Sequence, residues 1–559
     1  MTPSLAFLTW LGGHSQSYFW FAGSVITAAM VLAVLPLVRD GFDDIKRHDW
    51  AWGLVILAII IAGRWPTFVL PRELNADESQ DLAGALALTL DPVFWRSVDG
   101  HTTGPLDFFA LIPAGILSGW AGYLPARFTA LALWVATFTL LHQCLSLVTG
   151  RQLARVTGLG AVVFEALTNA PDFLHCSTEL VPITLWAGAA YAAIRRWGHD
   201  RPHPWNFVAG ILLGAMPLAK PQAAPLGAIF GFAWLVAEFI AGKREGLPAK
   251  LMLVGGAVLP AALFAVQITI AGEWDNVIIP YFDYNTAYVE VSALTHSELL
   301  FLLVKYSQME DSLMHLWMPL TLLGALLMLR RQPSADPAVR GLLWASLAAS
   351  ALAVWVALYP GRPFLHYWQF TVVPISLLAG AMAGNLISAP SQAGSRSRRL
   401  WVALSALVLV EVLLYQRARH PNRLVQTIAA RERQPMSPLS HRVALHARPG
   451  ESLVIWGWTN FVYIETGLLQ ATRCPTAERA IEPSRYRDFY RDRFLTDFAH
   501  ARPELFLDSV GPFSLHYVHP ALRHDNEFRE LAAIVRRDYV LIDDMGAARL
   551  YRRRDLVAP

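Results

Sequence analysis

The sequence predicts a polytopic α-helical membrane protein with about twelve transmembrane helices, followed by a soluble C-terminal α/β domain. Three observations predict this class. Of the 559 residues, 54% are hydrophobic and only 16% are charged, which is too apolar for a soluble protein of several domains. Apolar stretches long enough to cross a membrane recur as far as residue 415. Beyond residue 420, short apolar runs alternate with charged segments.

The predicted spans follow one another along the membrane part of the chain. Each needs roughly 20 apolar residues to cross the hydrocarbon core. They are expected at residues 18–38, 51–70, 127–149, 156–170, 180–194, 206–219, 223–241, 251–271, 313–329, 341–359, 368–388 and 400–415. The apolar segment 104–120 contains Asp107 and several Gly and Pro residues, so we expect it to lie in the membrane surface.

Loop charges orient these spans. With segment 104–120 at the surface, the basic loops all fall on one side, which the positive-inside rule identifies as the cytoplasm. These loops carry Arg39, Lys46, Arg47, Arg151, Arg155, Arg195, Arg196, Arg201, Lys243, Arg244, Lys250, Arg330, Arg331, Arg340, Arg396, Arg398 and Arg399. The opposite loops, 71–126, 171–179, 272–312 and 359–367, are rich in acids, aromatic residues and Pro, and they are expected to face outward together with the C-terminal domain.

The change in composition predicts a boundary between a membrane domain at 1–419 and a soluble domain at 420–559. Buried strands are expected at 451–458, 504–510 and 538–544, without a nucleotide-binding glycine motif. The net charge of +3 is spread over short basic clusters, so we expect no nucleic-acid partner. The three cysteines lack the spacing of a zinc site and are interpreted as packing residues.

The first outer loop carries an acidic segment, "NADESQDLAGALALTL" (75–90), whose apolar residues follow helical spacing. Asn75, with Glu78 three residues later, approximates a capping box, so a helix along the outer membrane surface is predicted. The cap explains Glu78, and a solvated surface position explains Asp81. The cap leaves Asp77 unexplained.

Three outward cations, His101, Lys220 and Arg362, stand next to predicted helix ends. Each alone is also explained by snorkelling to the interface or by contact with lipid phosphates. Together they predict an anion site. A carboxylate near such a site suits transfer of a sugar from a lipid phosphate to a hydroxyl, because the carboxylate takes the proton and the cations stabilise the departing phosphate.

The order of the motifs adds a family resemblance. After the acidic pair come "HTTGPLDFFALIPAGIL", "ARF" (126–128), "TEL" (178–180), "LAKPQ" (218–222) and "HYWQFTVVP" (366–374). In this order they resemble the GT-C glycosyltransferases over residues 50–415, and most of all the branch with bacterial lipid A aminoarabinose transferase and protein O-mannosyltransferases. The chain departs in reading "HTTGPL" where relatives read His-Pro-Pro-Leu, and in an extra span at 18–38 that leaves the N-terminus outside.

The resemblance implies roles for individual residues. Asp77 is implied as the general base on the acceptor hydroxyl, Glu78 as a residue that shapes the site or helps to bind a cation, and Glu179 as a second outward acid. The implied substrate-binding residues are His101, Lys220 and Arg362 at the donor phosphate and His366, Tyr367, Tyr281 and Tyr284 at the sugar. For the last two tyrosines an interfacial aromatic belt is the alternative.

The implied enzyme is an inverting hexosyl or pentosyl transferase in the bacterial inner membrane, with its site on the periplasmic side. Its partners would be a polyprenyl-phosphate sugar donor, membrane lipids, and a lipid, glycan or protein acceptor. The acidic pair permits a divalent cation, Mg or Mn, without requiring one. Two alternatives stay open: a transporter or flippase, for which Arg64 and Glu165 within apolar stretches are the unexplained residues, and a lipid-linked glycan polymerase or ligase.

Overall fold

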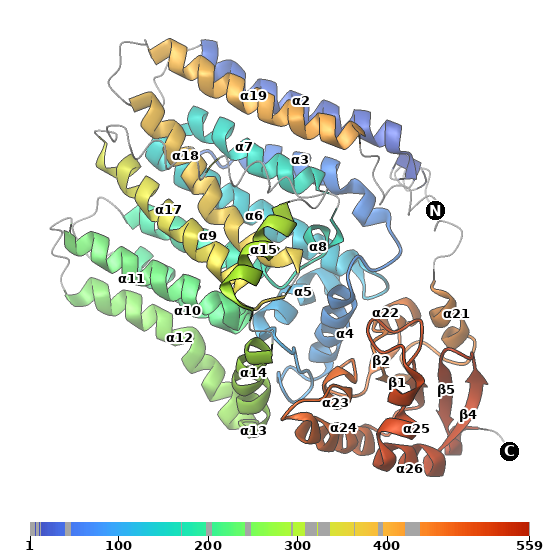
Figure 1. Ribbon diagram of the computed structural model, residues 1–559. Helices are drawn as coiled ribbons and strands as arrows, with labels where there is room; N and C mark the ends of the chain where they lie inside the picture. Colours follow the sequence, from blue (N-terminus) through green and yellow to red (C-terminus); the bar gives the residue numbers. More distant parts are fainter. Residues whose placement is uncertain are drawn as a thin grey trace. The chain divides into compact units, whose positions relative to one another are not determined.

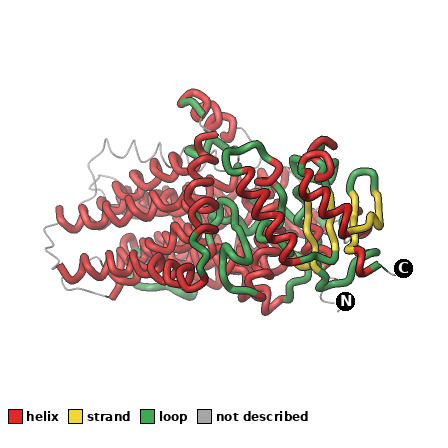
Figure 2. Tube along the Cα trace, turned by 90° about the horizontal axis from the view of Figure 1, so that it is seen from below, coloured by secondary structure: helices red, strands yellow, loops and turns green. Residues whose placement is uncertain are grey.

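The computed structural model describes residues 13–39, 46–168, 170–196, 204–240, 247–291, 294–307, 336–362, 364–388, 395–419 and 436–557, with isolated residues at 6, 10, 11 and 321. Most of the described chain is helical, and the strands are confined to the C-terminal part (Figure 2). The predicted span 313–329 lies outside the described residues, apart from Thr321.

The chain divides into two compact units. Unit 1 comprises Met1–Val69, Ala130–Ala265 and Tyr288–Ala430, and unit 2 comprises Leu70–Thr129, Val266–Ala287 and Arg431–Pro559. Unit 2 therefore contains the segment 70–129, which includes the predicted first outer loop, as well as the C-terminal residues. The single boundary at residue 420 stays a prediction.

Unit 1 is built from helices (Figure 1). Their bounds are α2 Ser15–Arg39, α3 Trp52–Val69, α6 Leu124–Thr149, α7 Arg151–Leu167, α8 Pro171–Leu174, α9 Leu180–Arg196, α10 Pro204–Ala219, η1 Pro221–Ala223, α11 Ala224–Ile240, α12 Leu247–Ala271, α14 Tyr284–Val291, α15 His296–Ser307, α17 Pro337–Leu358, η3 Leu365–Thr371, α18 Val372–Ser388 and α19 Ser395–Arg419. The first residues of α6 and α14 and the last of α12 belong to unit 2.

Six of the described helical segments are long and apolar enough to cross a membrane. They are Gln16–Val38, Trp52–Val69, Leu124–Thr149, Leu247–Ala271, Pro337–Leu358 and Leu365–Ser388. Shorter apolar helices, Pro204–Ala219 and Pro221–Val236, accompany them. The prediction of a helical membrane protein thus fits the described chain, while the count of about twelve spans stays a prediction.

Contacts between loops show which loops lie at the same end of the unit 1 bundle. At one end, Lys46 Nζ lies 3.0 Å from Asp336 and Arg155 Nε lies 2.7 Å from Asp49. The predicted basic loops that contain or adjoin these residues therefore meet, as the alternation of spans requires. At the other end, the backbone N–H of Leu365 donates to Asp172. Which end faces the cytoplasm stays a prediction.

Small residues let the helices of unit 1 approach closely. A Cβ atom added to Gly214 on α10 would lie 1.9 Å from the carbonyl oxygen of Ala257 on α12. Glycine is therefore required at this crossing, because any side chain would push the two backbones apart. At another side of the bundle α2 lies beside α19, although 355 residues (40–394) separate them along the chain (Figure 1).

Unit 2 begins with two helices of segment 70–129, α4 Ala76–Leu90 and α5 Pro105–Ser118, which pack on each other. The acidic segment thus forms the predicted helix. At 14 residues, α5 is about 21 Å long, too short for a hydrocarbon core of about 30 Å. Its length agrees with the prediction that segment 104–120 does not cross. The short α13 Asp275–Val277 and a π-helical stretch, η2 Ile278–Asp283, follow α12.

The C-terminal residues of unit 2 form a five-stranded sheet in the order β2-β1-β3-β5-β4. The strands are β1 Ser452–Trp456, β2 Leu469–Gln470, β3 Leu505–Asp508, β4 Tyr539–Asp544 and β5 Arg549–Arg553. β1 is parallel to β2 and β3, whereas β5 is antiparallel to β3 and β4. The three predicted strands are present as β1, β3 and β4. β5 reads "RLYRR", and its charges hide it from a hydrophobicity pattern.

Short helices surround this sheet: α21 Pro438–Ala444, α22 Phe461–Thr466, α23 Glu478–Ile481, α24 Arg487–Ala501, η4 Pro520–Leu522, α25 His524–Glu527, α26 Arg529–Asp538 and η5 Arg554–Leu556. Trp456, Phe494, Phe506 and Leu531 are among the buried side chains of the shared core. α4 of the first outer loop packs on α22 and β2. This packing places the acidic helix in the same unit as the C-terminal sheet.

Candidate functional site

The start of α4 carries the two predicted catalytic acids. Asn75 caps the helix, because its Oδ1 accepts a hydrogen bond of 3.0 Å from the N–H of Asp77. Glu78 Oε2 accepts from the N–H of Leu74, one residue before the cap. The predicted cap is therefore confirmed, with one difference from the usual capping box: Glu78 accepts from the N–H of Leu74 and not from that of Asn75.

Glu78 forms a bidentate ion pair with Arg127. The distances are 2.5 Å from Nε to Oε1 and 2.8 Å from Nη2 to Oε2, and the two side chains are buried. Arg127 Nη2 also donates to the carbonyl of Arg72. Both oxygens of Glu78 are thus occupied by protein donors.

Asp77 differs from its neighbour. It is half-buried at the first turn of α4, and within the described part of unit 2 its carboxylate forms neither a hydrogen bond nor an ion pair. A carboxylate at a helix N-terminus is favoured as the ionised form. Asp77 therefore presents a carboxylate whose oxygens are not taken up by donors of the described part of unit 2.

The prediction for Asp81 is wrong. Asp81 is buried, with 4% of its surface exposed, and is not a solvated surface acid. The reason is that α4 is covered by α5, α22 and β2, which helical spacing within the segment does not reveal. Glu73, just before the helix, is also shielded. Burial and the neighbouring acids Glu78, Glu465 and Asp77 raise the pKa of Glu73 to about 8, although a hydrogen bond from Ser79 acts to lower it.

In unit 1 the predicted residues Glu179 and Lys220 form a buried ion pair. Lys220 Nζ also donates to Thr178 Oγ1 at 2.7 Å and lies 4.9 Å from the ring centre of Tyr367. The loop before α9 supplies the acid and the end of α10 supplies the lysine, so the "TEL" and "LAKPQ" motifs meet. The lysine charge is balanced by Glu179.

His366 lies beside this pair. Its Nδ1 is 3.6 Å from Asp172, and its ring centre is 5.6 Å from that of His175. Burial opposes ionisation of Asp172, but a bond and the charge of His366 outweigh it, so the pKa of Asp172 lies well below its usual range. Arg362 stacks over the ring of Tyr288 at 4.5 Å. The sequence missed Asp172 and His175, because only folding brings the loop 171–179 against η3.

The other predicted residues lie in unit 2. His101 Nδ1 is 3.1 Å from Glu478, and its backbone has a φ of +59°, in the left-handed region. Burial and Arg479 disfavour the imidazolium, but bonds to Cys474 and Glu478 outweigh them and raise the pKa of His101 to about 9. His101 thus already has an anionic partner within its own unit.

The two tyrosines are buried. Tyr281 packs on Trp95 with ring centres 5.0 Å apart, and Tyr284 lies under the Arg479 guanidinium at 3.7 Å. Because an aromatic belt requires rings exposed at the membrane interface, that alternative does not hold for Tyr281 and Tyr284.

The ten predicted residues thus fall into two groups. Glu179, Lys220, Arg362, His366 and Tyr367 belong to unit 1, and Asp77, Glu78, His101, Tyr281 and Tyr284 belong to unit 2. Within unit 1 the structure brings Glu179, Lys220 and Tyr367 into contact. Within unit 2, Glu78 is bound to Arg127 and His101 is bound to Glu478.

A group of residues able to hold a cation occurs in the C-terminal part of unit 2. Asp508, His524 and Asp525 each offer a ligand atom, all within 4.8 Å of one another. Carboxylate and imidazole ligands fit a divalent transition metal such as Mn²⁺ better than Mg²⁺. Asp508 already binds His524 Nδ1 at 2.6 Å, and Arg549 lies 2.9 Å from Asp525. Because Arg549 competes for the same carboxylate, the group fits a cation poorly.

Comparison with solved structures finds similar chains at low sequence identity. ArnT from Cupriavidus metallidurans in the apo state is 12% identical, with a TM-score of 0.41 over 91% of this chain and 99% of that chain. The Archaeoglobus fulgidus oligosaccharyltransferase AglB in complex with an inhibitory peptide and a dolichol-phosphate is 13% identical, with a TM-score of 0.42 over 88% and 69%. No family model and no curated protein sequence matches the chain.

Proposed function

We propose that the protein is a membrane glycosyltransferase that moves a sugar from a polyprenyl phosphate to an acceptor hydroxyl on the extracytoplasmic side, with inversion at the anomeric carbon. The observation that carries this proposal is the contrast between the two acids at the start of α4. Glu78 is neutralised by Arg127, whereas Asp77 is half-buried without a hydrogen-bond or ion-pair partner in the described part of unit 2. A carboxylate whose oxygens are not taken up by protein donors can accept the proton of a bound hydroxyl, which is what a general base requires.

In this mechanism Asp77 accepts the proton of the acceptor hydroxyl as that oxygen attacks the anomeric carbon. The bond from the anomeric carbon to the phosphate oxygen breaks, and the phosphate leaves without needing a proton from an acid. Glu78 positions Asp77, because its pair with Arg127 fixes the first turn of α4. Arg127 occupies both oxygens of Glu78, so we assign Glu78 no role as a cation ligand.

The unit 1 group supplies the cations. Lys220 and Arg362 are proposed to hold the donor phosphate, and His366 and Tyr367 to line the sugar site. Lys220 is buried beside Glu179 and Thr178, so its ammonium is held in one place rather than free to snorkel. A fixed cation in a site that excludes water stabilises developing phosphate charge strongly.

Arg64 and Glu165, which a transporter would use within its spans, have a structural role here. Arg64 donates to Glu165 Oε2 at 2.8 Å and to the carbonyls of Glu165 and Phe173, both at 2.9 Å. These carbonyls lie in the last turn of α7 and in α8, where helices leave acceptors unpaired. Arg64, held by Glu165, therefore caps two helix ends. This structural role accounts for an ion pair within the apolar stretches without a transport function.

Transfer of a radiolabelled sugar from polyprenyl-phosphate donors tests the proposal in membranes containing equal amounts of each variant. Asp77→Asn keeps the shape and removes the base, so labelling should fall about a hundredfold or more. Asp91→Asn is the matched control: Asp91 is the C-cap of the same helix and forms an exposed pair with Arg96, so labelling should stay unchanged.

Unchanged labelling with Asp77→Asn would remove Asp77 as the base. If the wild type adds no labelling with any polyprenyl-phosphate donor, the transferase proposal itself fails. Equal losses in both variants would point to damage to α4 rather than to chemistry, and would also count against Asp77.

A further inference from the structure

Two buried arginines of unit 2 share one carboxylate. Arg479 on α23 lies 3.5 Å from Asp99 Oδ1, and Arg493 on α24 binds Asp99 Oδ2. Arg479 and Arg493 are 3% and 7% exposed. Burial disfavours the ionised form of Asp99, but the two guanidiniums hold its pKa well below its usual range. Asp99 therefore neutralises one of the two arginine charges.

The two adjoining carboxylates are already paired with other cations. Glu478 is paired with His101, which carries a proton at neutral pH because its pKa is raised to about 9. Asp497 is paired with Arg473 at 3.0 Å. The arginines and Asp99 are thus left with one excess positive charge in a buried place, which is costly unless a counter-charge is present.

The guanidinium groups also have more donors than their neighbours accept. Arg479 Nη1 donates to the Tyr490 hydroxyl at 2.5 Å, and Arg493 Nη2 reaches Cys474 Sγ at 3.3 Å. Arg479 Nε and Nη2 and Arg493 Nη1 are buried without a hydrogen-bond partner among the described residues. Buried donors of this kind are normally satisfied by an unseen group.

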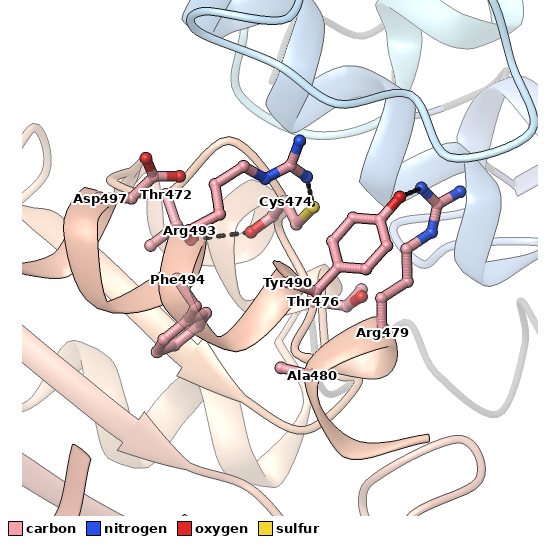
Figure 3. Close-up of a pocket in the computed structure, with 9 residues that line it drawn as sticks. All are labelled: Thr472, Cys474, Thr476, Arg479, Ala480, Tyr490, Arg493, Phe494 and Asp497. Atoms are coloured by element: carbon pink, nitrogen blue, oxygen red, sulfur yellow. Dashed lines mark hydrogen bonds between the residues drawn. The ribbon is translucent and has the colours of Figure 1, made fainter. Parts of the chain in front are cut away.

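A small cavity opens among these side chains (Figure 3). It is lined by Thr472, Cys474, Thr476, Arg479, Ala480, Tyr490, Arg493, Phe494 and Asp497. The centre of a water-sized sphere can move within a volume of about 10 Å³ inside it. A cavity of this size accommodates one water-sized group. A phosphate with its four oxygens is too large, whereas a single monatomic anion is close to the right size.

We propose that this cavity binds one small monovalent anion of the size of chloride. A water molecule can fill the space, but it accepts about two hydrogen bonds and brings no charge. Chloride accepts several N–H bonds and cancels the excess positive charge. Bound there, it holds Arg479 of α23 and Arg493 of α24, the two partners of Asp99, in place within unit 2. This site is independent of the proposed glycosyl transfer.

Thermal unfolding of the detergent-solubilised full-length protein tests the site. Sodium gluconate is exchanged for sodium chloride at constant ionic strength, and the unfolding midpoint should rise with chloride and saturate, as for a ligand that binds the folded state. In Arg493→Gln the apparent dissociation constant should rise about tenfold to a hundredfold, the effect of losing one charge-assisted hydrogen bond. Arg537→Gln, which removes an exposed arginine of α26 paired with Asp538, is the matched control and should respond like the wild type.

Crystals of the wild type grown in bromide give a second readout that depends on no variant. An anomalous peak between Arg479 and Arg493 is expected. Three results would each overturn the proposal. They are an unfolding midpoint that does not change with chloride, the same chloride response in Arg493→Gln as in the wild type, and a saturating shift of the midpoint with inorganic phosphate alone. Bromide crystals with no peak in the cavity would also overturn it.

Discussion

Replacing Arg127 by Gln should destabilise the protein strongly, because this arginine is the partner of a buried carboxylate. The change removes the two charge-assisted bonds to Glu78 and the bond to the carbonyl of Arg72. Glu78 is 0% exposed, so its charge cannot be solvated in place. Removing one partner of a buried pair typically costs about 3–5 kcal/mol. We expect a loss of about that size in the free energy of unfolding.

The measurement is unfolding of the purified protein by titration with SDS in mixed micelles, followed through tryptophan fluorescence. Glu78→Gln completes a double-mutant cycle: with the carboxylate charge gone, the glutamine can still accept from the N–H of Leu74. The double variant should therefore be less destabilised than the sum of the single variants, by about 1–3 kcal/mol.

Two results would refute this reasoning. A cost below about 1 kcal/mol for Arg127→Gln would mean that the pair is solvated and behaves like a surface ion pair. Additive costs in the double variant would mean that Arg127 and Glu78 act separately. In either case the fixed first turn of α4, on which the role of Asp77 depends, would lose its basis.

Three further outcomes follow. Glu73 binds its proton more tightly in the folded state, because its pKa there is about 8. Its contribution to the free energy of unfolding should therefore be full below about pH 4.5 and be lost as the pH rises to about 8. In Glu73→Gln this pH dependence of the free energy of unfolding should vanish when unfolding is measured across that range. Arg64→Met should uncap α7 and α8 and lower the free energy of unfolding by about 3 kcal/mol or more, and an unchanged value in the SDS titration would contradict the capping role. Lys220→Met removes the cation proposed to hold the donor phosphate, so sugar transfer should fall at least tenfold at matched protein levels, and Lys220→Arg, which keeps the charge beside Glu179, should restore part of it.

The sequence by itself determined the features that depend on local composition. Hydrophobic runs predict membrane helices because crossing a bilayer is a requirement on each segment separately. The helix at 76–90 and its Asn75 cap were predictable because capping involves residues only a few positions apart. The strands β1, β3 and β4 were predictable because each is a short apolar run. β5 was missed because its buried face is a single leucine among arginines.

Only the tertiary structure decided what the charged residues do. The partners of Glu78, Glu179 and Asp99 lie 49, 41 and 394 positions away along the chain, at Arg127, Lys220 and Arg493. No local pattern encodes such a pairing, because the energy of a charge depends on its burial and on neighbours that folding alone supplies.

The same reason explains the error at Asp81, which helical spacing left facing solvent and which α5, α22 and β2 cover. The sequence could therefore determine that acids and cations gather in the predicted outer loops. Which of them lack a hydrogen-bond or ion-pair partner, as Asp77 does within the described part of unit 2, is decided by the packing of segments distant in the chain.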